Sequence, residues 1–180
     1  MCRTAAALHW RATQAIEHRS FSMSTRILDD LGPLATSALD DAEQQLGVRL
    51  PADYRAFMLQ HNGGRPESDR FDISWQASQA AAAAGKGSLL SWFFSIYEER
   101  EENLLVANRV DFRGRLPSGT VAIGRDPGGN LLLLRTTGSR VGEVLYWLRE
   151  MEAEEGTTPT EDNVGFVADS FDDFLANRLH

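Results

Sequence analysis

His61 has the sequence surroundings closest to those of a catalytic residue, because it follows an apolar stretch and precedes Asn62. Its imidazole could act as a general base oriented by the carboxylate of Asp53 or Asp126, which defines a hydrolase hypothesis using His61. The alternative is that His61 ends a helix and interacts with free backbone carbonyls there. We favour the helix-terminal role, and we expect no catalytic residue and no enzyme activity.

Other sequence patterns that support catalysis or ligand binding are missing. Cys2 is the single cysteine, which excludes an intrachain disulfide and a thiolate metal cage. Residues 85–88 place a lysine between glycines but lack the spacing of a phosphate-binding loop, and neither a Gly-x-Ser-x-Gly nor a His-Glu-x-x-His sequence occurs. We therefore expect no cofactor and no metal ion.

Carboxylates form the second group of candidate functional residues. The chain has 26 acidic and 18 basic residues, a net charge of −8, and its densest acidic runs are residues 98–102 and 150–162. Binding to nucleic acid is disfavoured because phosphate contacts need clustered Lys and Arg. These runs serve either as solvated surface or as a surface that attracts a basic protein. The residues we predict to bind such a partner, including one aromatic residue beside the alanine-rich segment, are Trp75, Glu98, Glu99, Glu101, Glu102, Glu152, Glu154 and Glu155.

Residues 1–22 differ in charge from the rest of the chain. They hold three arginines and one glutamate, a balance of +2, whereas residues 23–180 hold 15 basic and 25 acidic residues, a balance of −10. We expect 1–22 to be a disordered or non-native N-terminal extension and 23–180 to be a single domain. No apolar run approaches the length of a membrane span, and the single cysteine favours the reducing cytoplasm.

Apolar periodicity predicts two helices at the start of this domain. Residues 24–46 have helical spacing, and Ser37 and Asp40 fit a capping box near the beginning of the pattern. A second helix follows Pro51 and ends at Asn-Gly-Gly, residues 62–64, which tolerate positive φ.

Short strands and tight turns dominate the remainder. A glycine-rich turn at 125–130 separates two strand patterns, and Ser170 and Asp173 fit the capping box of a closing helix. Helices followed by such strands predict an α+β fold: a single, mostly antiparallel sheet with helices packed around it. The expected strands are 71–75, 90–96, 120–124, 131–135, 143–148 and 164–167, with a helix at 98–112 whose first turns carry the glutamates.

Residues 46–64, which read LGVRLPADYRAFMLQHNGG, resemble the signature of the SUKH superfamily, the Smi/Knr-like proteins. That signature is a glutamate-bearing helix, Leu-Gly, Leu-Pro, a second helix with aromatic residues, and Asn-Gly-Gly. Further landmarks follow in order at 123–130 and 170–175, so the resemblance covers about residues 35–180. The alanine-rich residues 76–88 depart from the pattern.

This resemblance implies an α+β fold and a non-catalytic protein-binding function. Bacterial members are mostly immunity proteins that bind and neutralise toxins of polymorphic toxin systems, many of them nucleases. The resemblance therefore implies a basic toxin domain as the partner, and the alternative is a regulatory adaptor like the fungal regulators of cell-wall assembly. The motif residues, which we expect to serve turns and core, are Leu50, Pro51, Tyr54, Phe57, Asn62, Gly63, Gly64, Gly129, Asn130, Phe171 and Phe174.

Overall fold

The fold was analysed in a computed structural model that describes residues 25–76, 85–97, 99 and 101–180. The predicted extension at 1–22, most of the alanine-rich segment and Glu98 lie outside these residues. The predictions for them are therefore not addressed by the structure.

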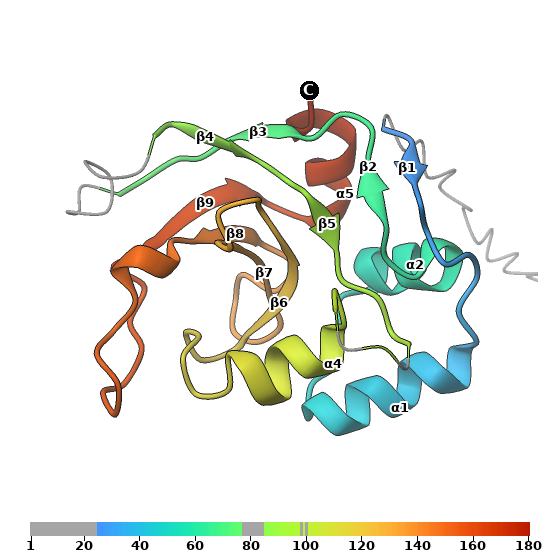
Figure 1. Ribbon diagram of the computed structural model, residues 1–180, viewed down its shortest axis with the longest axis horizontal. Helices are drawn as coiled ribbons and strands as arrows, with labels where there is room; N and C mark the ends of the chain where they lie inside the picture. Colours follow the sequence, from blue (N-terminus) through green and yellow to red (C-terminus); the bar gives the residue numbers. More distant parts are fainter. Residues whose placement is uncertain (1–24, 77–84, 98, 100) are drawn as a thin grey trace, which may run out of the picture.

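A five-stranded antiparallel sheet forms the centre of the molecule, with its strands side by side in chain order (Figure 1). The predicted meander is confirmed, and its glycine-rich turn joins the second strand to the third. The register pairs Leu132 with Tyr146, and Tyr146 with Gly165 on the next strand. The five strands are β5 (Trp92–Phe93), β6 (Thr120–Arg125), β7 (Leu131–Arg135), β8 (Val144–Trp147) and β9 (Val164–Ala168).

Two short antiparallel ribbons cover the two edges of this sheet. One joins β1 (Ile27–Leu28) to β2 (Arg65–Pro66), and the other joins β3 (Arg70–Asp72) to β4 (Gly87–Leu89). The backbones of Gly64 and Phe93 exchange hydrogen bonds of 3.3 and 2.8 Å at the β5 edge, and those of Ser74 and Phe166 exchange bonds of 2.8 and 2.9 Å at the β9 edge. Each edge strand of the sheet is therefore already paired over part of its length, which leaves less edge for pairing with another chain.

Helical segments pack on both faces of the sheet. Neighbouring residues of a strand point to opposite faces, and Tyr146 contacts Phe71 whereas Trp147 contacts Phe112. The α+β prediction is thereby confirmed. The helices are α1 (Thr36–Leu46), α2 (Ala52–His61), α4 (Leu104–Val106), the π-helix η1 (Ala107–Asp111), the 3₁₀-helix η2 (Arg149–Met151), α5 (Phe171–Asp173) and the π-helix η3 (Phe174–Arg178).

Aromatic residues join α2 and α5 to the edge of the sheet. Phe57 on α2 lies 4.9 Å from Phe93 on β5 and 5.0 Å from Phe171 on α5, measured between ring centroids. All three rings are buried, and burial of one such side chain contributes roughly 1.5–3 kcal/mol. The family-like aromatic residues thus lie in the core.

Asp53 links the same two helices through a side-chain cap. Its Oδ2 accepts hydrogen bonds from the backbone N–H groups of Phe171, at 2.9 Å, and Asp172, at 3.2 Å. These N–H groups have no partner within the helix because they lie in its first turn. The carboxylate therefore holds the start of α5 against α2.

Glu43 fixes the corner between α1 and α2. Its Oε1 accepts from the backbone N–H of Leu50 at 2.7 Å, and its Oε2 accepts from the guanidinium groups of Arg49 and Arg55. The carboxylate is buried, so these donors satisfy a group whose burial would otherwise be costly.

The beginning of the first helix differs from the prediction. The described part of residues 24–46 is not helical as far as Ala35, and α1 starts at Thr36. Gly32 has a φ of 74° and is followed by Pro33, which has no backbone N–H to donate. A right-handed helix therefore cannot continue through these two residues. The capping box was wrong, because the N-cap is Ala35 and Asp40 instead accepts a hydrogen bond from Arg55 at 2.8 Å.

The helix predicted at 98–112 also starts later, at Leu104. Asn103 is its N-cap, and its Oδ1 accepts from the backbone N–H groups of Leu105 and Val106 at 2.8 and 3.0 Å. Glu102 has a φ of 54°, which is incompatible with a right-handed helix. Glu99, Glu101 and Glu102 therefore lie in the loop before the helix and not in its first turns.

Tyr54→Phe is expected to raise the free energy of unfolding by about 1–2 kcal/mol, because it removes a buried polar atom that lacks a partner. The Tyr54 hydroxyl makes no hydrogen bond among the described residues, and complete burial raises the pKa of the phenol. Urea unfolding of the variant and the wild type measures the change.

Tyr146→Phe is the matched control, since the Tyr146 hydroxyl donates to Asp126 Oδ2 at 2.6 Å. Its removal is expected to destabilise the protein. Equal losses of stability in the two variants would contradict the assignment of an unpartnered Tyr54 hydroxyl.

Candidate functional site

His61 ends α2, as predicted, but its neighbour is a residue that sequence reasoning did not consider. Its Nδ1 lies 2.5 Å from Asp30 Oδ2, and its side chain is only 13% exposed. The predicted orienting carboxylates were wrong: Asp53 caps α5, and Asp126 accepts hydrogen bonds from Ser88 and Tyr146. The predicted interaction with helix-terminal carbonyls is replaced by the contact with Asp30.

The surroundings of His61 are those of a packed side chain. Its ring lies 5.4 Å from that of Phe57, and its Nε2 is buried without a hydrogen-bond partner in the described part of the chain. Five surface cavities of about 190 to 510 Å³ have other residues in their walls. The hydrolase hypothesis therefore gains no support from the geometry.

The first acidic cluster lies on the loop between β5 and α4. Glu99 and Glu101 are exposed and form no ion pair among the residues that the structure describes. Glu102 differs from them, because its Oε1 accepts from the guanidinium of Arg125 on β6 and its side chain is 19% exposed. Among the described residues, the cluster thus contains two exposed carboxylates and one that is largely buried.

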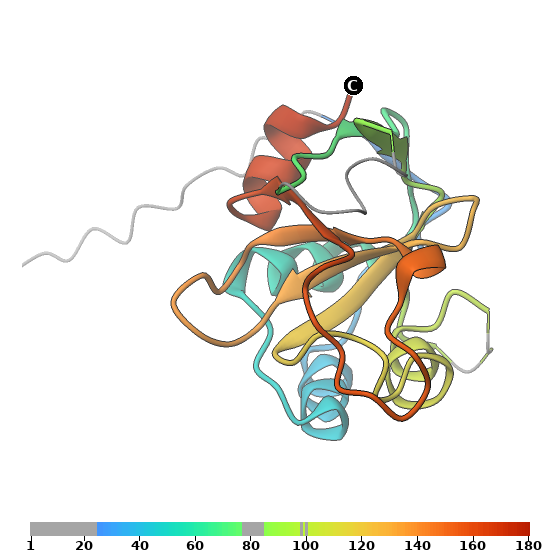
Figure 2. The same cartoon turned by 90° about the vertical axis from the view of Figure 1, so that its left-hand side faces the viewer.

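The second acidic cluster occupies a long loop between β8 and β9, which projects from the sheet on the side of the loop that follows η1 (Figures 1 and 2). Its base is closed by two hydrogen bonds between Leu148 and Asn163, at 2.9 and 2.8 Å. Near the ends of the loop, Arg115 binds Glu152 at 2.7 Å and Arg135 binds Glu161 at 2.9 Å.

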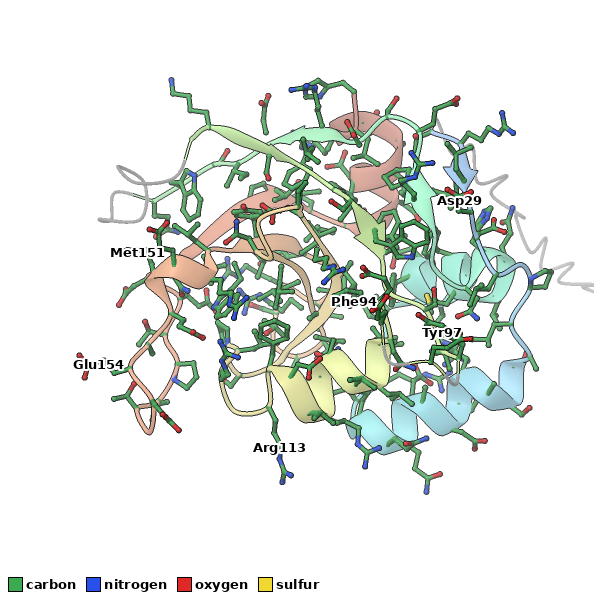
Figure 3. The ribbon with its side chains drawn as sticks, in the orientation of Figure 1. Asp29, Phe94, Tyr97, Arg113, Met151 and Glu154 are labelled. Carbon is green, nitrogen blue, oxygen red and sulfur yellow. The ribbon has the colours of Figure 1, made fainter. Side chains whose placement is uncertain are left out.

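These ion pairs divide the glutamates of this loop into two kinds. Glu152 and Glu161 hold the loop against the sheet and the turn after η1, whereas Glu154 and Glu155 are exposed and form no ion pair in the described ranges. Figure 3 shows Glu154 on the outer side of the loop. Of the predicted partner-binding residues on this loop, Glu154 and Glu155 are therefore the ones that remain available.

Both acidic clusters border the segment 112–115 that follows η1. A cavity of about 410 Å³ has Glu101, Glu102 and Phe112 in its walls, and another of about 480 Å³ is lined by residues 113–115 and 152–157. The sequence alone did not predict that the two clusters lie near the same segment, because they are about 50 residues apart in the chain.

Trp75 lines neither of these two cavities, but its neighbours Ser74 and Gln76 line another, of about 190 Å³, together with Glu161 and Asp162 of the second acidic run. The Nε1 of Trp75 donates to the backbone carbonyl of Gly85 at 3.1 Å, and its ring packs edge-on against Tyr146 at 6.2 Å. A Cβ on Gly165 would lie 3.3 Å from the same ring. Trp75 is thus half-buried against β8 and β9.

The motif residues occupy turns and core. Asn62 holds the chain before the glutamate loop, because its side chain exchanges hydrogen bonds of 2.9 and 2.8 Å with the backbone of Ile96. The backbone N–H of Asn130 donates to Asp126 Oδ1 at 2.9 Å within the β6–β7 turn. These contacts position loops and leave the residues themselves largely enclosed.

Sequence reasoning missed the arginines that neutralise the acidic clusters. Arg115, Arg125 and Arg135 lie 37, 23 and 26 residues from their glutamate partners Glu152, Glu102 and Glu161. The pair of Arg135 with Glu143 was the most accessible to prediction, because both residues flank one expected hairpin. The other pairs depend on how distant segments meet.

The described residues contain no group of three or more His, Cys, Asp or Glu side chains placed to hold a metal ion. Over the same residues, no helix has both the length and the apolar character needed to cross a membrane.

Comparison with known proteins relates residues 33–177 to a family model described as the SMI1/KNR4 family (SUKH-1). The chain is also similar to the SPbeta prophage-derived uncharacterized protein YokK of Bacillus subtilis (strain 168). The two are 25% identical over 146 residues, which span 76% of this chain and 70% of that protein.

Proposed function

Because the chain belongs to the SMI1/KNR4 family (SUKH-1), we propose that it is a non-catalytic, protein-binding immunity protein. In this proposal it binds and neutralises a basic, nuclease-type toxin of a bacterial polymorphic toxin system. The family match over residues 33–177 is the observation that carries the proposal, and the excess of 26 acidic over 18 basic residues supports a basic partner.

The proposed mechanism is steric occlusion assisted by electrostatic attraction. Unpaired carboxylates speed the encounter with a basic partner, and close packing of the two surfaces then sets the lifetime of the complex. The exposed glutamates of the two loops, Glu99, Glu101, Glu154 and Glu155, are the proposed steering residues. Glu102 and Glu152 already pair with arginines, so they contribute less to the external field.

Co-expression with the product of the neighbouring open reading frame tests this function. We expect that product to arrest growth when expressed alone and growth to recover when this chain is present. A neighbouring product that is not toxic, or toxicity that this chain does not relieve, would favour a regulatory adaptor of the cell-wall-regulator type instead.

Reversal of the steering charges is expected to slow association with the toxin. In a variant with Lys at positions 99, 101, 154 and 155, the association rate should fall about tenfold or more at low salt, because electrostatic steering contributes factors of roughly 10–10³. Stopped-flow kinetics over a range of salt concentrations measure the rate, whose salt dependence should also decrease.

A variant with Lys at Asp41 and Glu67 is the matched control. Both carboxylates are exposed and form no ion pair among the described residues, but neither lies on the acidic loops. The control reverses two charges and the loop variant four. If the control slowed association as much for each reversed charge as the loop variant, only the overall net charge would matter and the two loops would not be the steering surface.

A further inference from the structure

A cavity of about 410 Å³ lies between the glutamate loop, η1 and the β6–β7 turn. Phe94, Phe112 and Leu131 supply apolar wall, and Figure 3 shows Phe94 between β5 and α4. The polar wall includes Glu102 and the guanidinium-bearing side chain of Arg149. An apolar wall with a few polar groups suits a side chain that has an aliphatic stem and a polar end.

Glu102 is incompletely satisfied at this cavity. Its Oε1 is bound by Arg125, but its Oε2 is buried and has no hydrogen-bond partner in the described part of the chain. A buried carboxylate oxygen without a donor is costly. The site therefore lacks one donor, and a positively charged donor would satisfy it best.

The charge state of Glu102 agrees with a missing cation. Burial raises the pKa of this carboxyl group, and the charge and hydrogen bond of Arg125 only partly oppose that effect, while Glu101 adds to it. One guanidinium group is thus insufficient to offset the desolvation of the carboxylate. The backbone of Glu102 also has a φ of 54°, a conformation that is uncommon for residues other than glycine and is enriched at functional sites.

We propose that this cavity receives a lysine or arginine side chain of the partner protein, whose charged end binds the Glu102 carboxylate. The stem of the side chain lies against Phe112 and Leu131. The torsion at the Glu102 carboxylate is soft, so the group can turn its free oxygen toward a donor that enters the cavity. The walls of the cavity carry three acidic residues, Glu101, Glu102 and Asp111, against the two arginines Arg125 and Arg149, so the acidic charges exceed the basic ones by one. This inference rests on the proposed function for the source of the side chain, but the site can be tested without a toxin.

Titration of the ¹⁵N-labelled protein with Nα-acetyl-arginine amide and Nα-acetyl-lysine amide tests the site by NMR. We expect saturable shifts at the amides of Glu102, Asn103, Phe112 and Gly129, with millimolar affinity, as is usual for one side chain. Nα-acetyl-citrulline amide has nearly the same shape without the charge, and it should bind at least about tenfold more weakly, the effect of roughly 1.4 kcal/mol. Equal shifts with citrulline, or no saturable shifts at these amides, would overturn the proposal.

Glu102→Gln should abolish the response to both basic probes, whereas Glu67→Gln, on the surface away from this cavity, should leave it unchanged. If Glu102→Gln does not fold, the wild-type Glu102 carboxyl can be titrated with and without probe. A bound cation favours the carboxylate, so the probe should lower the pKa of Glu102 and bind more tightly as the pH rises through that pKa. A pKa that the probe leaves unchanged would refute the contact.

The site and the proposed function can fail separately. Probe binding without rescue from toxicity would refute the proposed function and leave the site intact. Rescue from toxicity without probe binding would refute the site and leave the proposed function intact.

Discussion

Replacement of Arg135 by methionine is expected to lower the free energy of unfolding by about 3–5 kcal/mol, because it leaves the buried Glu143 carboxylate with only the exposed guanidinium of Arg140 as a cation. The Arg135 side chain is only 9% exposed, and its Nε donates to Glu143 Oε2 at 3.0 Å. Its two terminal nitrogens donate to Glu161 at 2.9 and 3.1 Å. Methionine preserves much of the packing volume but none of these bonds. Urea unfolding at neutral pH measures the loss.

Arg140→Met is the matched control. Arg140 contacts the same two glutamates, at 3.2 and 3.9 Å, but its side chain is 55% exposed, and exposed pairs contribute about 0–1 kcal/mol. The double variant Arg135→Met, Glu143→Gln should recover part of the stability, because it removes the uncompensated charge. If Arg135→Met cost no more than Arg140→Met, the buried pair would not be a major source of stability.

The stability of the protein at low pH should depend on the same ion pairs of Arg135. The hydrogen bond from Arg135 lowers the pKa of Glu161, so this group contributes stability above its unfolded-state pKa, ordinarily about 4.3. That contribution is lost as the pH falls through the lower folded-state value. The wild type should therefore lose stability over this acidic range, and the Arg135→Met variant should lose less of it.

Gly64→Ala is expected to destabilise the protein by about 3 kcal/mol or more, because strain and steric overlap coincide at this position. Gly64 has a φ of 111°, in the region that favours glycine. A Cβ there would lie 2.7 Å from Cγ2 of Ile27 and 2.9 Å from the backbone oxygen of Leu28. Backbone cannot move aside as a flexible side chain does, so the pairing of β1 with β2 should be disturbed. Thermal unfolding measures the loss.

Gly47→Ala separates the two causes. Gly47 caps α1 with a φ of 70°, but nothing lies within 4 Å of a Cβ built on it. The free energy of unfolding of this control should fall only by the strain of a non-glycine residue at positive φ, about 1–2 kcal/mol. Equal losses at Gly47 and Gly64 would mean that the contacts with β1 add nothing.

The parts of the fold that sequence could predict are those specified by neighbouring residues. The meander is one example, since Gly128 and Gly129 make a turn between two apolar runs that pair directly across it. The second helix is another, because Pro51 and Asn62 mark its two ends. In each case the signal and the structure it specifies lie within a few residues.

The starts of α1 and α4 could not be predicted in this way. Residues 25–35 do not continue the helix because Ile27 pairs with Pro66 on β2. The loop before α4 is set by a hydrogen bond from the backbone N–H of Ser95 to the carbonyl of Glu102. For the same reason, the sequence could not predict which of the acidic residues are available to a partner. Whether a glutamate is exposed or neutralised depends on arginines such as Arg115 and Arg125, which arrive from other elements.

The Asp53 cap has a consequence for the order of events during folding. It joins residues 118 positions apart, whereas β6, β7 and β8 pair across short turns. Closing a large loop costs more chain entropy than closing a small one, and distant contacts slow folding. The hairpins of the meander can therefore form early and independently, while the docking of α5 on α2 completes the native state. We therefore expect the hydrogen bonds of Asp53 to form after the main folding barrier, so that their loss would mainly speed unfolding and shorten the lifetime of the folded protein.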